Sequence, residues 1–359
     1  MAAQLCACLA ETIGDDKSGV PNGNNDMSLL AVAAGSNFVR RLSDRPVADA
    51  VSAPGYGALF NAGLMHHDGV YHLFARGVRS GYRPNLGPGD RFVHYLSDVV
   101  VLTSLDGLCY RFAYVLARAG IGGATCLEDP RVQRVPTRGA EHAVMTYTWL
   151  PPVGSGSPWR IGAHRLRWDG RRFWLQVRSG RLLGPDGIAN KDAVIFTLAD
   201  GRVALIHRIY PNMQLAVFDD LDHLWDPDDG YWDSYLAELD AHTLLVPSPG
   251  ALNVGAGAPP VRTDAGLLLF FHERRGDGSY TMNLALLDPT NGEVLSRLPG
   301  AVLEPELEWE KHGDVDNVIF VQGAHRDGDN LYLTYGAADH CVGAATASVS
   351  HLLGALAAA

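Results

Sequence analysis

Short hydrophobic segments alternate with turn residues along most of the chain. Typical segments are GVYHLFARG, EHAVMTYTWL, RRFWLQVRS and AGLLLFFHE, which are rich in Val, Tyr, Phe and Leu. The β-branched and aromatic residues among them are those that strands prefer. The connectors include HDG, ADG and RDGDN, in which Asp and Gly tolerate the positive φ of tight hairpin turns. This pattern predicts antiparallel strands joined by short hairpins.

Helical periodicity is confined to two stretches. One is DSYLAELDAH at 233–242, and the other is the tail SVSHLLGALAAA at 348–359. Because no other segment places apolar residues on one helical face, the sequence predicts an all-β protein.

A larger repeat groups the predicted strands. In each unit a hydrophobic strand is followed by a turn and by a second strand that ends in an aromatic residue, Arg or His. The units lie near 61–76, 141–174, 192–208, 262–273 and 317–336. Sheets that repeat radially in this way are typical of a propeller. The sequence therefore predicts a five-bladed β-propeller, built as a single domain over residues 28–359, and a pair of β-sandwiches is the alternative.

Composition limits the location and the partners of the chain. Hydrophobic residues make up 47% of it and charged residues 19%, so a large core is expected. The net charge of −11 argues against nucleic acid and anionic membranes as partners. No apolar run is long enough to span a membrane. The polar segment GDDKSGVPNGNNDM predicts a flexible lead-in over residues 1–27. The five cysteines lack metal-ligand spacing, so we expect free thiols, a cytoplasmic protein and no bound metal.

The stretch TCLEDPRVQRV places Glu128, Asp129 and Arg131 beside Pro130, where the strand is expected to end. A carboxyl group that stays protonated near neutral pH can act as an acid on a glycosidic oxygen. Burial and the neighbouring Glu128 would raise the pKa of Asp129, and Arg131 would oppose this. The alternative is a turn in which Asp129 caps backbone amides and pairs with Arg131.

Three basic residues, Lys191, Arg208 and His272, stand at or just past predicted strand ends. If they converge they would form a cradle for phosphate, because Arg binds phosphate through two hydrogen bonds and Lys adds a point charge. If they do not converge, each is a solvated or paired surface residue.

Several motifs in order resemble one known family. They are LEDPRV, NKDAVIF, LIHRIY, GAGAPPVRTDAGLLLFFHE and the long block from Ala285 to Ala347. Together they resemble the β-mannoside phosphorylases and β-mannosidases of glycoside hydrolase family 130, over roughly residues 55–355. The resemblance implies a five-bladed propeller that cleaves β-mannosidic bonds of manno-oligosaccharides with inversion at the anomeric carbon.

The resemblance also implies roles for individual residues. Asp129 matches the proton donor, which in this family relays its proton through a sugar hydroxyl. Lys191, Arg208 and His272 match the positions that hold phosphate in the phosphorylases. The expected substrate-binding residues are Asn61, Arg76, Glu128, Arg131, Asp192 and Asp339.

Three departures from the phosphorylase pattern favour water over phosphate as the acceptor. Asn253 stands at a position of Lys, Glu273 at a position of a small residue, and Asp316 at a position of Pro. Extra carboxylates would repel a phosphate dianion by about 1–4 kcal/mol per close pair. We therefore expect hydrolysis, with Asp129 as the acid and Glu273 or Asp316 as the base.

Other interpretations remain open. Phosphorolysis, with inorganic phosphate as co-substrate and α-mannose 1-phosphate as product, is the main alternative, and a sugar-binding propeller without turnover is a third. No other cofactor is expected. Because family members are often oligomers, a homo-oligomer is open, and the sequence does not decide between β-1,2 and β-1,4 linkages.

Overall fold

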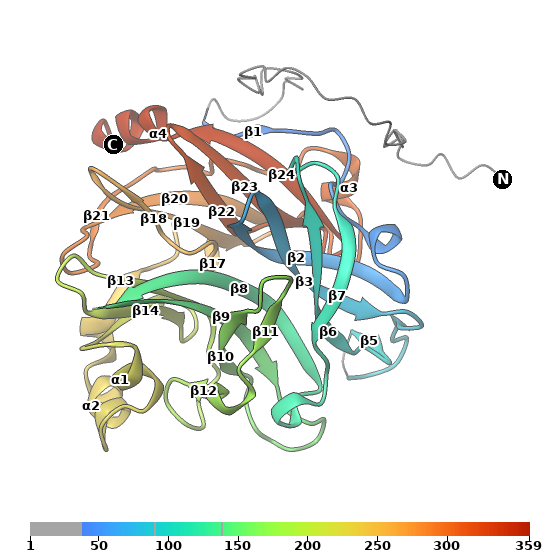
Figure 1. Cartoon of the computed structure of the whole chain (residues 1–359), viewed down its shortest axis with the longest axis horizontal. Helices are drawn as coiled ribbons and strands as arrows, with labels where there is room; N and C mark the ends of the chain where they lie inside the picture. Colours follow the sequence, from blue (N-terminus) through green and yellow to red (C-terminus); the bar gives the residue numbers. More distant parts are fainter. Residues whose placement is uncertain (1–37, 90, 138) are drawn as a thin grey trace. The chain divides into compact units, whose positions relative to one another are not determined.

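The computed structural model describes residues 38–359, except residues 90 and 138. The predicted lead-in at 1–27 therefore lies outside the described residues. The described residues belong to one compact unit and form five antiparallel sheets of four or five strands, which are the blades of a propeller, and one two-stranded sheet (Figure 1). The predicted five-bladed β-propeller is thus confirmed.

Each of the first three blades begins with its innermost strand and continues outward along the chain. The first contains β2 (Tyr56–His67), β3 (Val70–Arg79), β6 (Ser97–Ser104) and β7 (Arg111–Ala117). The second contains β8 (Cys126–Thr137), β9 (Ala140–Leu150), β10 (Arg160–Trp168) and β11 (Phe173–Leu175), and β12 (Arg181–Leu183) also pairs with β10. The third contains β13 (Lys191–Thr197), β14 (Val203–Arg208), β15 (Met213–Phe218) and β16 (Thr243–Leu245).

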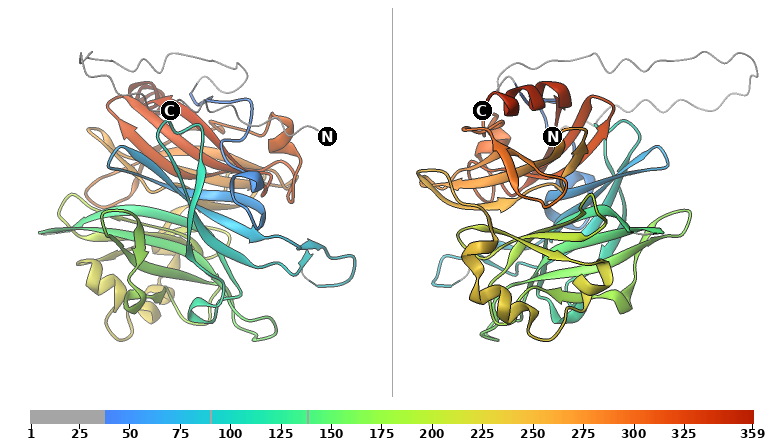
Figure 2. Two further views of the ribbon diagram at one scale, coloured as in Figure 1. Left: turned by 45° about the vertical axis from the view of Figure 1, so that its right-hand side comes forward. Right: turned by 90° about the vertical axis from the view of Figure 1, so that its left-hand side faces the viewer.

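The last two blades complete the ring. The fourth contains β17 (Ala251–Ala256), β19 (Gly266–Arg275), β20 (Tyr280–Leu287) and β21 (Val294–Arg297), and β18 (Val261–Thr263) pairs with β19. The fifth contains β22 (Ile319–Asp327), β23 (Asn330–Ala337), β24 (Cys341–Ser348) and the early strand β1 (Arg40–Arg41). The β4–β5 hairpin, formed by Arg83–Pro84 and Phe92–Val93, projects beyond the first blade (Figure 2).

Helices are short and few among the described residues. The α-helices are α1 (Leu221–Trp225), α2 (Tyr231–Ala237), α3 (Glu308–Lys311) and α4 (Val349–Ala357). Single 3-10 turns occupy Ala50–Ser52, Ile121–Gly123, Val177–Ser179 and Leu239–His242. Both predicted helical stretches are therefore present, at α2 with the turn that follows it and at α4. In the part of the chain that the structure describes, no helix is long and apolar enough to cross a membrane.

The core lies between adjacent blades. In β19, the side chain of Phe270 packs with Ile319 and Val321 of the fifth blade, whereas Phe271 packs with Val194 and Ile206 of the third. A sheet covered on both faces needs apolar residues at every position, and this explains the continuous run LLLFF.

The innermost strands carry backbone irregularities that position the site. Asn61, Asp129 and Asp192 have φ of 46°, 52° and 56°, each at a register shift in an innermost strand, and Asn317 has φ of 58° just before β22. Asn and Asp tolerate this left-handed conformation better than most residues, and a bulge redirects the side chain that it carries. The expectation that β8 ends at Pro130 is wrong. The strand continues because its free edge faces the propeller centre, where no partner strand needs the missing N–H.

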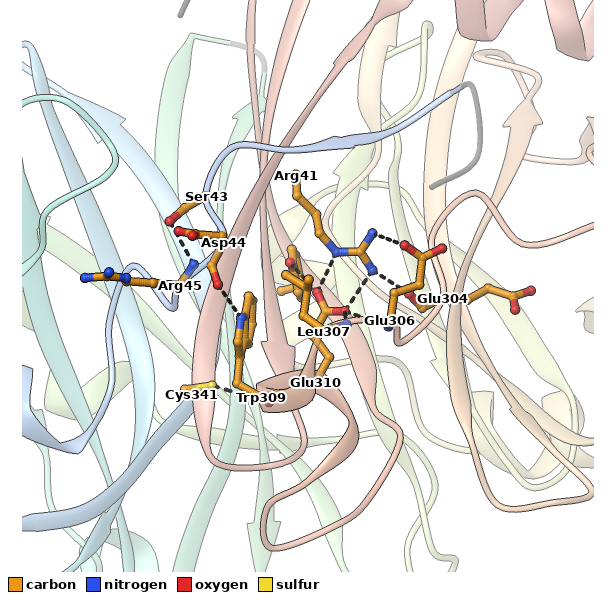
Figure 3. Close-up of polar contacts among 11 residues, drawn as sticks. Arg41, Ser43, Asp44, Arg45, Glu304, Glu306, Leu307, Trp309, Glu310 and Cys341 are labelled. Carbon is orange, nitrogen blue, oxygen red and sulfur yellow. Dashed lines mark hydrogen bonds and ion pairs between the residues drawn. The ribbon is translucent and has the colours of Figure 1, made fainter. Parts of the chain in front are cut away.

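The first and last parts of the described chain are joined by a buried ion pair (Figure 3). Arg41 of β1 donates from Nε and Nη2 to the two carboxylate oxygens of Glu310 in α3, over 2.7 and 2.8 Å. The hydroxyl of Tyr335 donates to the same carboxylate over 2.9 Å, and Trp309 Nε1 donates to the Asp44 carbonyl over 2.9 Å. These contacts reinforce the pairing of β1 with β24, which attaches an early strand to the last blade.

Candidate active site

Asp129 is held by two residues of the first blade. Its Oδ1 accepts hydrogen bonds from Asn61 Nδ2 over 2.8 Å and from Arg76 Nη1 over 3.3 Å. Its Oδ2 makes no hydrogen bond to any described residue, and only 7% of the side chain is exposed. One oxygen is therefore fixed, and the other remains available to a substrate hydroxyl.

Arg76 links the carboxylates around Asp129. Its Nη2 donates to Glu128 and, over 3.0 Å, to the hydroxyl of Tyr95. Burial disfavours the charge on Arg76, but Glu128, Tyr95 and Asp129 outweigh this and raise its pKa well above the ordinary value. Burial also raises the pKa of Glu128. Arg76 lowers this pKa, and Asp129 raises it further.

Asp339 is a carboxyl group whose pKa lies near neutral pH. It lies in the turn between β23 and β24, with φ of 51°, and is half-buried. Burial raises its pKa to about 7; Asp129 and Glu128 add to this, while Arg76 and Lys191 oppose it. This group can therefore exchange a proton near neutral pH.

A second cluster is centred on Asp192 at the start of β13. Its Oδ1 accepts from Arg131 Nη2 over 3.2 Å, and its Oδ2 lies 3.1 Å from Arg208 Nε and 3.5 Å from His272 Nε2. Burial favours the neutral acid, but Arg208, His272 and Arg131 hold the pKa of Asp192 well below its usual range. Asp192 is therefore ionised and keeps these basic residues together.

Arg131 joins the two clusters. Its Nη1 donates to the backbone carbonyl of Asp129 over 3.0 Å, while Nη2 bonds Asp192. Its remaining donors bond the carbonyls of Ala256 and Gly257 over 2.7 and 3.0 Å. All of its donor groups thus serve the scaffold, so Arg131 places the clusters side by side and has little capacity left for a ligand.

His272 differs from its predicted role as a positive charge. Burial lowers its pKa to about 4, and the nearby Asp192 only partly offsets this, so the ring is neutral at pH 7. The ring packs 4.1 Å, centroid to centroid, from Phe320, and Nδ1 has no hydrogen-bond partner in the described chain. Its contribution to a ligand would be a hydrogen bond.

Lys191 and Arg208 are cross-strand partners at the same end of the third blade. Arg208 Nη1 donates to Asn253 Oδ1 over 2.7 Å, so the amide at position 253 orients the guanidinium. Lys191 is half-buried, and its side chain forms no hydrogen bond or ion pair with the described residues; its Nζ lies 6.0 Å from the centroid of the Trp159 ring. Arg208 and His272 therefore meet at Asp192, and strand pairing places Lys191 beside Arg208.

Gly255 makes room for this cluster. A Cβ at this position would overlap Asp192 Oδ2 and lie 2.6 Å from His272 Nε2. The motif GAGAPP thus allows the backbone to lie close to these two side chains.

Glu273 and Asp316 lie away from these clusters, contrary to their predicted role as bases. Glu273 points to the opposite strand face from His272 and accepts from Arg297 Nη2 over 2.7 Å and from the Ser248 amide over 2.6 Å. The Asp316 side chain is 64% exposed and lies 3.9 Å from His312 Nδ1. Neither carboxylate contacts Asp129 or its partners, so neither is positioned to activate water there.

Tyr95, Tyr280 and Phe320 contact the clusters but were not among the predicted residues. Tyr95 bonds Arg76, and the ring of Tyr280 lies 6.0 Å from that of His272. Tyr280 is the first residue of β20 and follows an Asp-Gly turn. It thus stands at a strand end, as the predicted residue Lys191 does. Their aromatic character alone gave no distinction from core residues.

Two hollows lie near the inner strands. One, of about 820 Å³, is lined by Phe92, Tyr95, Cys126, Pro151 and Trp159, and so adjoins Arg76 and Lys191 through their aromatic partners. Another, of about 440 Å³, lies at the far ends of the inner strands, where Leu64, Val132, Ile195 and Ala324 line it. The second hollow is not lined by Glu128, Asp129 or Asp339. We therefore locate the candidate active site by its charged groups and not by the hollows.

No group of three or more His, Cys, Asp or Glu side chains is arranged for a metal ion among residues 38–89, 91–137 and 139–359.

Comparison with known proteins gives consistent results. Residues 182–357 match the model of glycoside hydrolase family 130, described as beta-1,4-mannooligosaccharide phosphorylase. A 1,2-beta-oligomannan phosphorylase of Thermoanaerobacter sp. is 28% identical over 316 residues, which cover 86% of this chain and 96% of that protein. A beta-1,2-mannobiose phosphorylase of the same organism is 28% identical over 324 residues, which cover 85% of this chain and 95% of that protein.

A solved structure shares the fold. Beta-1,2-mannobiose phosphorylase from Listeria innocua, solved with beta-1,2-mannobiose, superimposes with a TM-score of 0.69 at 20% identity. The match covers 89% of this chain and 99% of that chain. The chain belongs to glycoside hydrolase family 130, and it is an enzyme of the class that contains glycosidases and glycoside phosphorylases.

Proposed function

We propose that the chain is an inverting β-mannoside phosphorylase. It transfers a mannosyl unit from a manno-oligosaccharide to inorganic phosphate, and the products are α-mannose 1-phosphate and the shortened sugar. The β-1,2 linkage is the proposed substrate linkage, because the two relatives that match over at least 85% of this chain are named for β-1,2-linked substrates.

The observation that carries this proposal is the position of the basic cluster. Arg131 connects Asp129 to Asp192, and Asp192 gathers Arg208 and His272. Lys191 is close enough to lower the pKa of both Glu128 and Asp339, so its charge faces the acid cluster. A phosphate between Lys191 and Arg208 would therefore lie beside the sugar that Asp129 contacts.

Hydrolysis, which the sequence favoured, is less well supported than phosphorolysis. Glu273 and Asp316 were its candidate bases, and both lie away from Asp129. Glu273 is neutralised by Arg297, so it also does not repel an anion at the basic cluster. The relatives that match over most of the chain are phosphorylases. A sugar-binding module without turnover does not fit membership of an enzyme family.

The proposed reaction needs one proton and one nucleophile. A phosphate oxygen attacks the anomeric carbon from the face opposite the leaving group, and the bond from that carbon to the glycosidic oxygen breaks. Asp129 supplies the proton that the glycosidic oxygen gains, directly or through a sugar hydroxyl. The fixed Oδ1 sets the orientation of the carboxyl group, and the open Oδ2 carries the proton.

The hollow beside Tyr95 and Trp159 is the proposed site for sugars on the leaving side. Its volume of about 820 Å³ lies in the range of ligand pockets and exceeds the needs of one monosaccharide. Trp159 is 47% exposed, so its ring is accessible for stacking against a sugar face.

The proposal is tested by incubating the protein with β-1,2-mannobiose, with and without phosphate. We expect mannose 1-phosphate and mannose in equal amounts when phosphate is present, and little cleavage when it is absent. Mannose as the sole product at the same rate in both samples would overturn the phosphorylase assignment in favour of hydrolysis.

A further inference from the structure

Arg274 is a cation that the proposed reaction does not use. It lies in β19, where it pairs across the ladder with Asn253 of β17 and with Tyr280 of β20. The residue is exposed, and its side chain has no hydrogen bond or ion pair with the described residues. Its guanidinium carbon lies 5.8 Å from the centroid of the Tyr280 ring, which is its observed contact.

Strand geometry puts Arg274 on the face of the basic cluster. Alternate residues of a strand share a face, so Arg274 lies on the same face as His272. Glu273 and Arg275 point the other way, and each is paired there: Glu273 with Arg297, and Arg275 with Glu304. Of these two neighbouring arginines, only Arg275 is neutralised by a carboxylate.

Tyr280 connects Arg274 to the rest of the site. Its ring lies 6.0 Å from the His272 ring and 6.1 Å from the Phe320 ring. Burial raises the pKa of Tyr280, Arg274 and Arg208 lower it, and Asp339 and Asp192 raise it. Tyr280 thus lies beside both Arg274 and His272 and connects the exposed cation to the basic cluster.

We propose that Arg274 binds the attacking phosphate together with Arg208 and Lys191. Position 253 carries an uncharged amide whose oxygen already accepts from Arg208, so it adds no positive charge. His272 is neutral, and Arg131 is occupied by Asp192 and by backbone carbonyls. Arg274 supplies the missing charge from the adjacent strand, with planar N–H groups suited to phosphate oxygens.

This inference rests on the proposed function, since it concerns the phosphate that acts as co-substrate. It also makes a separate statement about binding, because phosphate affinity can be measured without turnover. Inorganic phosphate is therefore the probe in both parts of the experiment.

The test compares Arg274→Gln with Arg275→Gln, an adjacent substitution on the opposite face. Isothermal titration gives the phosphate Kd, and initial rates with β-1,2-mannobiose give the phosphate KM. We expect Arg274→Gln to raise both roughly 10- to 100-fold, as for the loss of a charge-assisted contact, and Arg275→Gln to leave both unchanged. Asn253→Lys in the Arg274→Gln background should recover part of the lost affinity, because a cation returns to the partner strand.

The outcomes separate this inference from the proposed function. Equal phosphate Kd values in wild type and Arg274→Gln would overturn the role of Arg274 while leaving phosphorolysis intact. A Kd that depends on Arg274 in a protein that releases no mannose 1-phosphate would support the binding site and overturn the phosphorylase assignment. Wild-type protein that binds no phosphate would overturn both.

Discussion

Two buried arginine–carboxylate clusters in this propeller serve different purposes. Around Arg41 and Glu310, each carboxylate oxygen accepts at least two hydrogen bonds, and no buried polar atom of Arg41, Glu310 or Tyr335 lacks a partner. Around Arg76 and Asp129, by contrast, Arg76 Nε and Asn61 Oδ1 are buried without hydrogen-bond partners in the described chain.

The two clusters also differ in their access to solvent. Glu310 is completely buried, whereas Glu128, Lys191 and Asp339 are half-buried. Since buried polar groups are nearly always hydrogen-bonded, an incomplete cluster that opens to solvent indicates a place for a ligand, and a complete one indicates structure. The following changes test this distinction.

The largest effect is expected for Asp129→Asn. The amide keeps the shape of the side chain and can still accept from Asn61, but it cannot supply a proton. We expect kcat to fall by about 10²- to 10⁴-fold, the usual contribution of a general acid. Thermal unfolding should change little. Near-normal turnover would contradict the role of Asp129 as the acid.

Glu310→Gln should show the opposite behaviour. The substitution leaves the buried Arg41 charge without its main partner, and removing one member of a buried pair typically costs about 3–5 kcal/mol. The free energy of unfolding from urea titration should fall by this amount, while kcat per folded molecule stays close to wild type. A large loss of kcat in folded protein would show that the Arg41–Glu310 ion pair also shapes the active site.

Gly255→Ala tests the basic cluster by steric overlap alone. The added Cβ would displace Asp192 or His272, whose positions hold Arg208. We expect the phosphate KM to rise about tenfold, the equivalent of a contact worth about 1.4 kcal/mol. Gly300→Ala is the matched control, because a Cβ there meets nothing within 4 Å.

The smallest effect concerns pH. The pKa of Asp339 is raised to about 7, so the group is mostly protonated below pH 7 and gains a negative charge above it. That charge develops beside the carboxyl groups of Glu128 and Asp129, and we expect kcat/KM to fall severalfold between pH 6.5 and 8.5. Asp339→Asn should lose this part of the decline. Comparing both proteins at each pH removes the contribution of phosphate ionisation, and identical profiles would contradict the assignment to Asp339.

Much of the fold could be predicted from the pattern of residues. The five repeat units and the Asp-Gly hairpins follow from local chemistry that short windows record. Pro130 misled the prediction, because its effect depends on whether the strand edge is paired, and the free edge at the propeller centre is a tertiary feature.

Only part of the candidate site could be predicted from the sequence. The stretches around Asp129, Lys191 and His272 were visible because they place charged residues at strand ends. The roles predicted for Glu273 and Asp316 came from residue type and position in the chain. The structure separates them from Asp129, because Glu273 points to the opposite strand face and finds Arg297 there, while Asp316 remains in solvent.

The sequence by itself determined the all-β architecture, the five repeats and the supply of charged residues at the ends of the inner strands. These properties are local, since strand preference, turn chemistry and periodicity act over a few residues. Only the tertiary structure decided which charges meet and which are neutralised. Arg131 joins residues 129 and 192, Glu273 is paired with Arg297, and Arg274 is left beside Tyr280. Such pairings depend on strand face and blade order, which bring distant segments within a few ångströms.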